Sequence, residues 1–295
     1  MGPAFLESER VGVTVLDGKV ASQALSAELQ TQIAELKADG VTPTLAAVLV
    51  GDDPASQVYL HSKQKRAAKF GLRMLTTTLP ATTTTAELIV VLQQLNQDPR
   101  VHAIMLEMPL PAQIDSQQAI LVLDPAKDVD GVHPLNLGYL FGGQPHAIPN
   151  TPYGILKLLD HYQLSVKHKN VVVVGRSVVV GRSLAALLLN RDATITIAHS
   201  YTENLAELTR QADILVVAVG RANFITADAV KPGAIVIDVG MNRLANGKLV
   251  GDVDYANVVT KAGAITPVPG GVGPMTSLML LYQTVQFARR QTKHG

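Results

Sequence analysis

Tyr59 and Lys63 are the first residues whose types and spacing suggest chemistry. They lie four positions apart in a segment with helical character, so their side chains share one face of a helix. An aromatic ring beside an ammonium suits a planar heteroaromatic substrate, and a partly desolvated lysine can act as an acid, a base or a water activator. Because Lys65, Arg66 and Lys69 follow closely, an ordinary solvated helix face stays open as the alternative.

Two aspartates, Asp128 and Asp130, lie close together in the stretch 127–134, KDVDGVHP. Paired acids can orient a substrate amine or a pyrimidine-like N–H group, but aspartates in turns also satisfy local backbone N–H groups. Spacing alone leaves both interpretations open. The eight histidines are scattered and no pair resembles a ligand set, so we expect no metal site.

The valines at 171–174 run into Gly175, and a helix is expected after Gly181. A strand, a glycine turn and a helix N-terminus form the arrangement that cradles a pyrophosphate. The spacing here is G-x-S-x-x-x-G, with Ser177 as its polar member, rather than the usual G-x-G-x-x-G. Gly175 permits a tight turn and Gly181 a close approach of helix to sheet, although an ordinary strand-to-helix turn would also be rich in glycine.

The next expected strand, 194–198, indicates which nicotinamide cofactor such a turn would take. A site that prefers NAD usually offers an acid at the end of this strand, but no carboxylate occurs here before Glu203. Arg176 and Ser200 could instead bind a 2′-phosphate, which favours NADP. The alternatives are a solvated cation for Arg176 and a helix N-cap segment for His199 and Ser200.

A stretch poor in side chains, 266–274, has three glycines and three prolines in nine residues. Such a loop allows close approach of the backbone to a ligand, and a simple hinge between domains is the structural alternative.

These residues must be positioned by short aliphatic strands that alternate with helices, a pattern typical of a parallel α/β sheet. The stretch 124–151 is rich in Pro, Gly, Asn and Asp and is expected to be a loop. The expected strands are 45–50, 72–78, 104–107, 170–174, 194–198, 214–218, 235–239 and 263–265. The expected helices are 20–37, 56–70, 84–96, 152–162, 183–189, 203–209 and 276–290.

The hexapeptide VVVGRS occurs twice in tandem, at 172–177 and 178–183. Repeat architectures use units of about 20 residues or more, so we treat the repeat as a coincidence. We expect a strand-to-turn conformation for the first copy and a loop-to-helix conformation for the second.

The composition sets limits on the class of protein. The length of 295 residues predicts two domains of roughly 150 residues each, and 47% hydrophobic with 17% charged residues excludes a disordered chain. A net charge of +1 argues against nucleic acid as a partner. The absence of cysteine excludes disulfides, thiolate zinc sites and cysteine nucleophiles. The absence of Trp and the 4% aromatic content predict an aliphatic core.

Residues 1–12 contain charged side chains and no apolar run of signal-peptide length, which predicts a disordered leader. The most apolar stretches fall short of the roughly 18 residues that span a bilayer. We therefore expect no membrane association and a cytoplasmic location.

Together these segments resemble the bifunctional methylenetetrahydrofolate dehydrogenase/cyclohydrolase family. The blocks at 127–131 and 266–276 are the most specific, and the matches keep the family's order along the chain. The matching stretches are DGK at 17–19, VG at 50–51 with PAS at 54–56, Tyr59-x-x-x-Lys63, PLP at 109–111, KDVDG at 127–131, TP at 151–152, the turn 175–181, IDVG at 237–240 with NR at 242–243, GDV at 251–253 and TPVPGGVGPMT at 266–276.

The resemblance implies an α/β fold with two α/β domains flanking a cleft. The first would be a folate-binding catalytic domain, 1–147, completed by a C-terminal helix at 275–295 that returns to it. The second, 148–274, would be a Rossmann-like NADP-binding domain. The family also implies a homodimer formed through the cofactor domains and a role in one-carbon metabolism and purine biosynthesis.

The activity implied is oxidation of 5,10-methylenetetrahydrofolate by NADP, followed by hydrolysis of the methenyl product to 10-formyltetrahydrofolate. In this resemblance Lys63 activates the water, Tyr59 stacks on the folate and Asp130 holds the pterin. The positions matching cofactor contacts are Gly175, Arg176, Ser177, Ser200 and Met241, and Pro269, Gly270 and Gly271 join the substrate-binding set.

Glu107 departs from the family pattern, which usually has Gln before Pro-Leu-Pro, and it joins the expected catalytic set. A carboxylate would pair with the Lys63 ammonium and hold it charged, so hydrolysis could be impaired or shifted in pH while hydride transfer is less affected. Ser183 replaces a frequent Pro at a helix start that Ser also suits, and Asn150 replaces a frequent Cys. A nonenzymatic module that binds NADP and folate is the alternative from another class, and retention of Lys63 and Asp130 argues against it.

Overall fold

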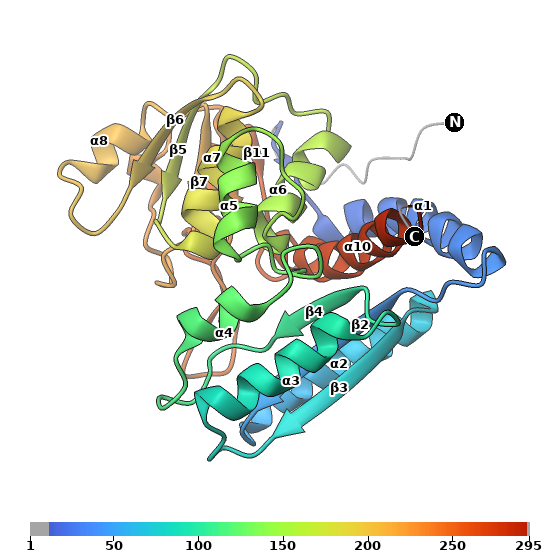
Figure 1. Ribbon diagram of the computed structural model, residues 1–295. Coiled ribbons are helices and arrows are strands. Elements are labelled where there is room, and N and C mark those ends of the chain that lie inside the picture. Colours follow the sequence, from blue (N-terminus) through green and yellow to red (C-terminus); the bar gives the residue numbers. More distant parts are fainter. Residues whose placement is uncertain (1–11, 294–295) are drawn as a thin grey trace. The chain divides into compact units, whose positions relative to one another are not determined.

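The computed structural model describes residues 12–293, which form two compact units (Figure 1). The first unit is Val20–Gly154 with residues 275–293, and the second is residues 12–19 with Ile155–Pro274. The predicted leader lies outside the described residues except for Gly12. No helix in the described range is both long and apolar enough to cross a membrane.

The first unit is built on a three-stranded parallel sheet in the order β3-β2-β4. Its strands are β2 (Thr44–Val50), β3 (Arg73–Leu79) and β4 (Ala103–Leu106). Every residue of β2 is buried, because helices cover both faces of this central strand, as parallel sheets require. Ala46 and Val48 pack in one core with Leu88 of α3 (Thr85–Gln97), while Leu45 packs in another core with Leu60 of α2 (Pro54–Phe70).

The C-terminal helix, α10 (Val272–Lys293), completes the first unit from residue 275 onward. Leu278 of α10 shares a core with Leu29 of α1 (Gly18–Ala38), and Phe287 packs beneath the sheet with Leu45. The predicted return of this helix to the first domain is therefore confirmed.

The second unit contains a six-stranded parallel sheet in the order β1-β11-β8-β7-β5-β6. Since the strand order reverses at the pair β5 and β7, the carboxyl ends of these two strands form the switch point at which open α/β sheets bind ligands. The strands are β1 (Thr14–Val15), β5 (Asn170–Val174), β6 (Thr194–Ala198), β7 (Ile214–Val217), β8 (Ile235–Asp238) and β11 (Ala264–Ile265), and a hairpin of β9 (Asn242–Arg243) and β10 (Leu249–Val250) adds to them.

The remaining helices connect these strands. In the first unit they are α4 (Ser116–Val122) and α5 (Pro134–Phe141), and α6 (Asn150–His161) runs from the first unit into the second. In the second unit they are the π-helical turn η1 (Val178–Arg182), α7 (Ser183–Leu189), α8 (Leu205–Thr209), the 3₁₀ turn η2 (Ala227–Ala229) and α9 (Tyr255–Val258).

Two local predictions are wrong. The expected loop 124–151 contains α5, which begins with Pro134 at a position where the missing N–H costs nothing and is capped by His133, whose Nδ1 accepts from the Leu135 N–H at 3.1 Å. The second VVVGRS copy is not a loop but the turn η1, because Ser177 Oγ accepts from the Val180 N–H at 3.3 Å and starts the turn directly. The two copies do differ in conformation, as expected.

Candidate active site

Helix α2 presents Tyr59 and Lys63 near its middle. Asp53 fixes the start of this helix, since its Oδ2 accepts from both the N–H and the hydroxyl of Ser56 at 2.8 Å. Gly71 ends it in the left-handed conformation, with φ of 80°. Tyr59 is 55% exposed and offers a ring face to solvent, as a stacking platform requires.

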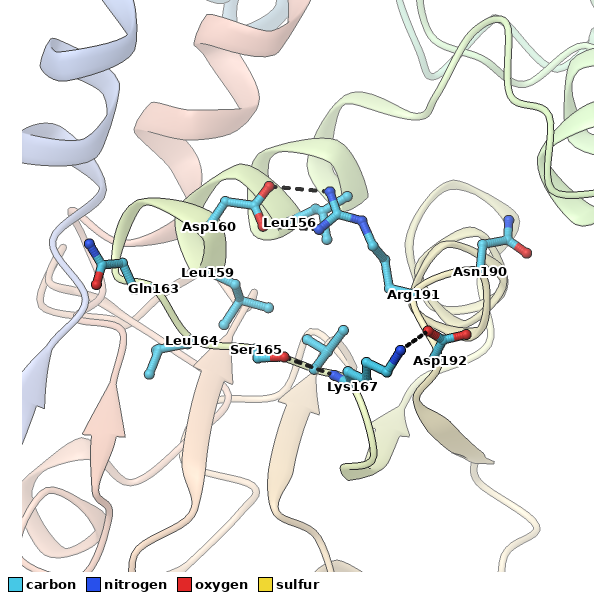
Figure 2. Close-up of a pocket in the computed structure, with 11 residues that line it drawn as sticks. Leu156, Leu159, Asp160, Gln163, Leu164, Ser165, Lys167, Asn190, Arg191 and Asp192 are labelled. Atoms are coloured by element: carbon cyan, nitrogen blue, oxygen red, sulfur yellow. Dashed lines mark hydrogen bonds and ion pairs between the residues drawn. The ribbon is translucent and has the colours of Figure 1, made fainter.

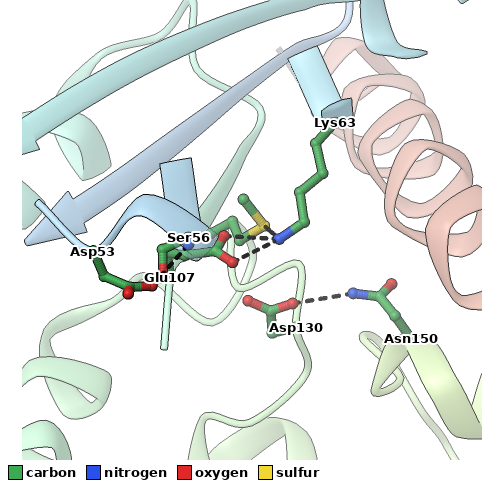
Figure 3. A network of polar contacts seen from close by, with 7 residues as sticks. Asp53, Ser56, Lys63, Glu107, Asp130 and Asn150 are labelled. Carbon is green, nitrogen blue, oxygen red and sulfur yellow. Dashed lines mark hydrogen bonds and ion pairs between the residues drawn. The ribbon is translucent and has the colours of Figure 1, made fainter. Parts of the chain in front are cut away.

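Lys63 forms an ion pair with Glu107, which directly follows β4. The lysine Nζ donates to Glu107 Oε2 at 2.7 Å and to Oε1 at 3.0 Å, and it lies 3.6 Å from Met105 Sδ (Figure 3). Only 31% of the Lys63 side chain and 11% of the Glu107 side chain are exposed. The expected pair thus forms in a largely water-excluded place, where its electrostatic attraction is stronger than at the surface.

Asp130 lies beside this pair and has a perturbed acidity. Asn150 Nδ2 donates to Asp130 Oδ1 at 3.1 Å (Figure 3), and Gln283 of α10 in turn donates to Asn150 Oδ1 at 2.8 Å. Burial, together with the nearby Asp128 carboxylate, raises the pKa of Asp130 to about 7, against the opposing effect of the Lys63 charge. Asp130 therefore changes charge near neutral pH.

Asp128, in contrast, forms hydrogen bonds that hold the loop itself together. It is fully buried, and its Oδ2 accepts from the His133 N–H at 2.8 Å and from Asn136 Nδ2 at 2.9 Å. Burial raises its pKa. The Lys127 ammonium donates to backbone carbonyls, including that of Asn96 at 2.7 Å. Of the two interpretations open for this loop, turn formation fits Asp128, whereas Asp130 interacts electrostatically with Lys63 and Glu107.

The turn after β5 in the second unit has the geometry of a phosphate cradle. Gly175 has φ of 128°, and a Cβ there would lie 2.3 Å from the Ala218 carbonyl oxygen. A Cβ on Gly181 would lie 2.0 Å from the Gly175 carbonyl oxygen, so both positions require glycine. Backbone this close to the start of a helix, at the switch point of the sheet, fits a pyrophosphate.

The end of β6 supplies the residues expected near an adenosine ribose. The Arg176 guanidinium carbon lies 5.4 Å from the centroid of the Tyr201 ring, and both side chains are exposed. Ser200 is also exposed, and His199 Nδ1 accepts from the Tyr201 N–H at 3.2 Å. These residues offer a cation, a hydroxyl and an aromatic face, which fits a cofactor with a 2′-phosphate.

Two buried carboxylates that sequence reasoning missed shape the neighbouring loops. Asp252 accepts three consecutive backbone N–H groups, those of residues 219–221, at 2.6 to 2.9 Å, and Asn242 Nδ2 at 2.8 Å. Asp238 accepts the N–H groups of Gly240 and Asp252 at 2.9 Å, and burial raises its pKa to about 6. Their signal in the sequence is an aspartate at the end of an aliphatic strand and another between glycine and valine.

Met241 and the loop 269–271 also lie in the second unit. Met241 is 59% exposed just after β8. The Gly18 N–H donates to the Gly270 carbonyl at 2.9 Å, and a Cβ on Gly18 would strike the Gly271 carbonyl. Pro269 is exposed while Gly271 is buried, so the start of α1 holds this loop tightly.

A cavity of about 460 Å³ lies at the opposite edge of the second sheet, where Lys167 precedes β5 and Asp192 precedes β6 (Figure 2). Its charges are already paired, Asp160 with Arg191 and Lys167 with Asp192, each at 3.1 Å. The predicted site residues lie elsewhere. Within residues 12–293, no group of three or more His, Cys, Asp or Glu could hold a metal ion.

Comparisons with known proteins give a consistent result. Residues 16–130 match the model of the tetrahydrofolate dehydrogenase/cyclohydrolase catalytic domain, and residues 149–292 match that of the NAD(P)-binding domain of the same family. The bifunctional protein FolD of Lacticaseibacillus casei is 54% identical over 278 residues, which cover 94% of this chain and 98% of that protein.

Solved structures agree with these matches. The bifunctional FolD methylenetetrahydrofolate dehydrogenase/cyclohydrolase from Campylobacter jejuni superposes with a TM-score of 0.93 at 45% identity, covering 94% of this chain and 99% of that one. The Trypanosoma brucei N5,N10-methylenetetrahydrofolate dehydrogenase-cyclohydrolase, complexed with NADP cofactor and an inhibitor, has a TM-score of 0.90 at 36% identity, with coverage of 95% and 99%.

Proposed function

Because the chain belongs to the tetrahydrofolate dehydrogenase/cyclohydrolase family, we infer that it is a bifunctional enzyme of one-carbon metabolism. It oxidises 5,10-methylenetetrahydrofolate with NADP and hydrolyses 5,10-methenyltetrahydrofolate to 10-formyltetrahydrofolate. The observation that carries this function is the group Lys63, Glu107, Asp130 and Asn150 in the first unit. It gathers an ammonium, two carboxylates and an amide beside an exposed aromatic ring.

The charge balance of this group favours the oxidation. NADP, when bound, accepts a hydride from the methylene carbon, which leaves a positively charged product. An isolated Lys63 ammonium would oppose that charge, but Glu107 neutralises it at 2.7 Å. Fixed charges aimed at the place where charge develops are usually the largest contribution to catalysis.

In the hydrolysis step, the Lys63–Glu107 pair acts on a water molecule rather than on the charge of the product. Water forms a bond to the methenyl carbon and gives up one proton to a base as it adds. The second proton of the water passes to N5 as the bond from that carbon to N5 breaks, which leaves the formyl group on N10. We propose that Lys63 holds this water by a hydrogen bond and that its Nζ takes up the proton. Glu107 opposes this step, because its two oxygens accept from Nζ at 2.7 and 3.0 Å and hold that nitrogen as a donor.

Asp130 is proposed to bind the pterin ring. The ring offers neighbouring N–H donors, and a carboxylate is the acceptor that binds them most strongly. Because the pKa of Asp130 is raised to about 7, the carboxylate form is fully present only above neutral pH. Tyr59 would stack on the same ring, and the exposed Pro269 with Gly270 and Gly271 would complete the substrate contacts.

For the cofactor, we propose that the turn at Gly175 and Ser177 holds the pyrophosphate of NADP. Arg176 and Ser200 would bind the 2′-phosphate, and Met241 would be a further contact. The absence of an acidic side chain from the stretch 199–202 supports NADP over NAD.

We further propose that the protein acts in the cytoplasm as a homodimer joined through its NADP-binding domains, and that its product supplies purine biosynthesis. Residues 1–147 with 275–295 would be the folate domain and 148–274 the NADP domain. Light scattering during size-exclusion chromatography would measure the mass, and a monomer at working concentration would contradict the dimer.

A steady-state assay of both reactions tests the function. NADPH formation from methylenetetrahydrofolate and decay of methenyltetrahydrofolate are followed with NADP and with NAD. We expect both reactions, with NADP the better cofactor. Tight binding of both ligands without turnover would indicate a nonenzymatic module, and accumulation of the methenyl compound would indicate a dehydrogenase with impaired hydrolysis.

A further inference from the structure

Tyr201 is an aromatic residue of the second unit to which the proposed function gives no role. It is 80% exposed, more than any other large apolar residue of the described chain. Because the ring is hardly buried, it contributes little to the free energy of folding. Its replacement should therefore leave the fold intact, and its contacts on the surface indicate what it does.

Residues 199–202, called the 199–202 turn from here on, follow β6 directly and hold Tyr201 in place. The His199 N–H donates to Thr202 Oγ1 at 2.9 Å, and the Thr202 N–H donates to the His199 carbonyl at 2.8 Å. The Tyr201 N–H donates to His199 Nδ1 at 3.2 Å, and the two rings meet edge to face with their centroids 6.2 Å apart. These contacts fix the backbone of the turn and limit the positions open to the Tyr201 ring.

The 199–202 turn lies beside the glycine turn that follows β5. The two strands pair in parallel, and at their ends the Gly175 N–H donates to the Ala198 carbonyl at 2.8 Å. This pairing brings Arg176, two residues beyond β5, next to the 199–202 turn. The Arg176 guanidinium carbon lies 5.4 Å from the centroid of the Tyr201 ring, which is within the range of a cation–π interaction.

The Arg176 side chain is exposed and has no carboxylate partner among residues 12–293. A free arginine on a surface adopts many side-chain conformations, and a ligand that binds it must order them at a cost in entropy. The Tyr201 ring restricts the guanidinium in advance. Because the ring is uncharged, it leaves the positive charge and the N–H donors of Arg176 available to a phosphate.

We propose that Tyr201 is a positioning residue that strengthens the preference for NADP over NAD by holding Arg176 in place for the 2′-phosphate. This rests on the proposed function, in which Arg176 and Ser200 bind that phosphate. The 2′-phosphate is the group that distinguishes the two nucleotides, so a residue that acts through Arg176 affects the binding of NADP and not that of NAD. A ring that stacked on the adenine would instead affect both nucleotides equally.

Isothermal titration calorimetry of the full chain with NADP and with NAD, in the absence of folate, tests this proposal. Tyr201→Ala should weaken NADP binding about two- to fivefold, as the loss of an exposed cation–π contact would, and leave NAD binding unchanged. Tyr201→Phe keeps the ring and should keep the NADP affinity of the unaltered protein. Tyr139→Ala, the same change at an exposed tyrosine of the first unit whose ring also meets a histidine, is the matched control and should leave both affinities unchanged.

A double-mutant cycle with Arg176→Gln tests whether Tyr201 acts through Arg176. Arg176→Gln alone should weaken NADP binding about tenfold or more, and adding Tyr201→Ala to it should change the affinity less than about 1.5-fold. The proposal is overturned if Tyr201→Ala leaves NADP binding unchanged, weakens NADP and NAD binding equally, or has its full effect in the Arg176→Gln background. Bound NADP that is not reduced when methylenetetrahydrofolate is supplied would instead count against the proposed function alone.

Discussion

The carboxylate of Glu107, 2.7 Å from Lys63 Nζ, compensates the positive charge that this lysine presents to a substrate. The Lys63–Glu107 pair is neutral as a whole and shielded from water, so it tolerates a cationic product while keeping a proton available between two basic atoms. An amide at position 107 would leave the ammonium charge uncompensated. We therefore propose that the identity of this one side chain sets the balance between oxidation and hydrolysis.

Replacement of Glu107 by Gln should change hydrolysis more than oxidation. The amide carries no negative charge to hold Nζ of Lys63 as a donor, so this nitrogen is freer to accept the proton of the attacking water. Hydrolysis at neutral pH should rise about fivefold, while oxidation should fall by a smaller factor of about twofold, because the ammonium charge is no longer compensated. Both rates are measured across a pH series. Glu35→Gln, which removes a carboxylate from the exposed pair with Arg289, serves as the control, and superimposable profiles for Glu107→Gln and the unaltered protein would refute the expectation.

Asp130 should make both binding and stability depend on pH. Its folded pKa of about 7 lies above the value of roughly 3.9 in an unfolded chain. The folded state thus holds the extra proton between about pH 4 and 7, and the stability linked to this group is lost as the pH rises through 7. We expect the KM for folate to fall over the same rise, because the ionised carboxylate is the better acceptor.

The stability part is checked with Asp130→Asn. Denaturant unfolding between pH 5 and 8 should show the variant gaining about 1 to 3 kcal/mol relative to the unaltered protein as the pH rises. Asp39→Asn, at an exposed aspartate, should show a constant difference. A constant difference for Asp130→Asn as well would mean that this carboxyl does not titrate near neutrality.

At the scale of elements, the turn from β5 through η1 into α7 brings backbone groups to the switch point of the second sheet. The π-helical turn allows the hydroxyl of Ser183 to donate to the Val178 carbonyl at 2.5 Å, five residues back along the chain. π-helical turns of this kind are frequent at functional sites. The two glycines allow contact distances that no side chain would permit.

Gly175→Ala should weaken NADP binding. The added Cβ would meet the Ala218 carbonyl and impose a left-handed conformation on alanine. We expect a loss of about 2 kcal/mol or more in stability and at least a tenfold weaker affinity. Calorimetric titration with NADP measures the affinity.

Gly138→Ala in α5 is the control, because nothing lies within 4 Å of the added Cβ. This variant should stabilise the folded protein by about 0.5 to 1 kcal/mol and leave the NADP affinity unchanged. Equal affinities in both variants would show that the Gly175 turn does not bind the cofactor.

Local patterns predicted the elements that carry the motifs, including α2 and the strand before Gly175, because apolar periodicity and glycine stops are strong there. They could not predict α5, because Pro134 and Gly138 are residue types common in loops. The helix becomes evident only in the structure, where His133 caps its start. The carboxylate network of Asp238 and Asp252 joins residues that are 14 positions apart, so the chain between them must fold back. A contact between two such distant residues leaves no periodic pattern of apolar residues in the sequence. The pairing of Lys63 with Glu107 was expected from family resemblance, not from spacing.

At the scale of the whole molecule, the two units correspond largely to the two family models, although residues 275–292 of the NAD(P)-binding model belong to the first unit. One unit holds the proposed folate-reacting groups and the other the proposed NADP-binding turn. Each ligand should therefore stabilise mainly the unit that binds it, since a ligand that binds only the folded state favours that state by mass action.

Hydrogen exchange measured by mass spectrometry tests this division. NADP at about a hundred times its dissociation constant should add up to about 2.7 kcal/mol of protection to amides of the second unit, such as those in β5 and β7. Amides of β2, in the centre of the first unit, should change less. Tetrahydrofolate should give the reverse distribution. Protection spread evenly over both units by either ligand would contradict the assignment.

The duplicated VVVGRS also has a consequence while the chain is still folding. Val172–Val174 form most of β5, whereas the same letters six residues later form η1. Six is an even number, so a chain that placed the second copy in the sheet would keep the inward and outward alternation of its side chains. The nascent protein therefore holds two interchangeable candidates for one central strand. Only the first leaves enough chain to build the phosphate turn and α7, so selection between the copies depends on the helix that follows rather than on the strand itself.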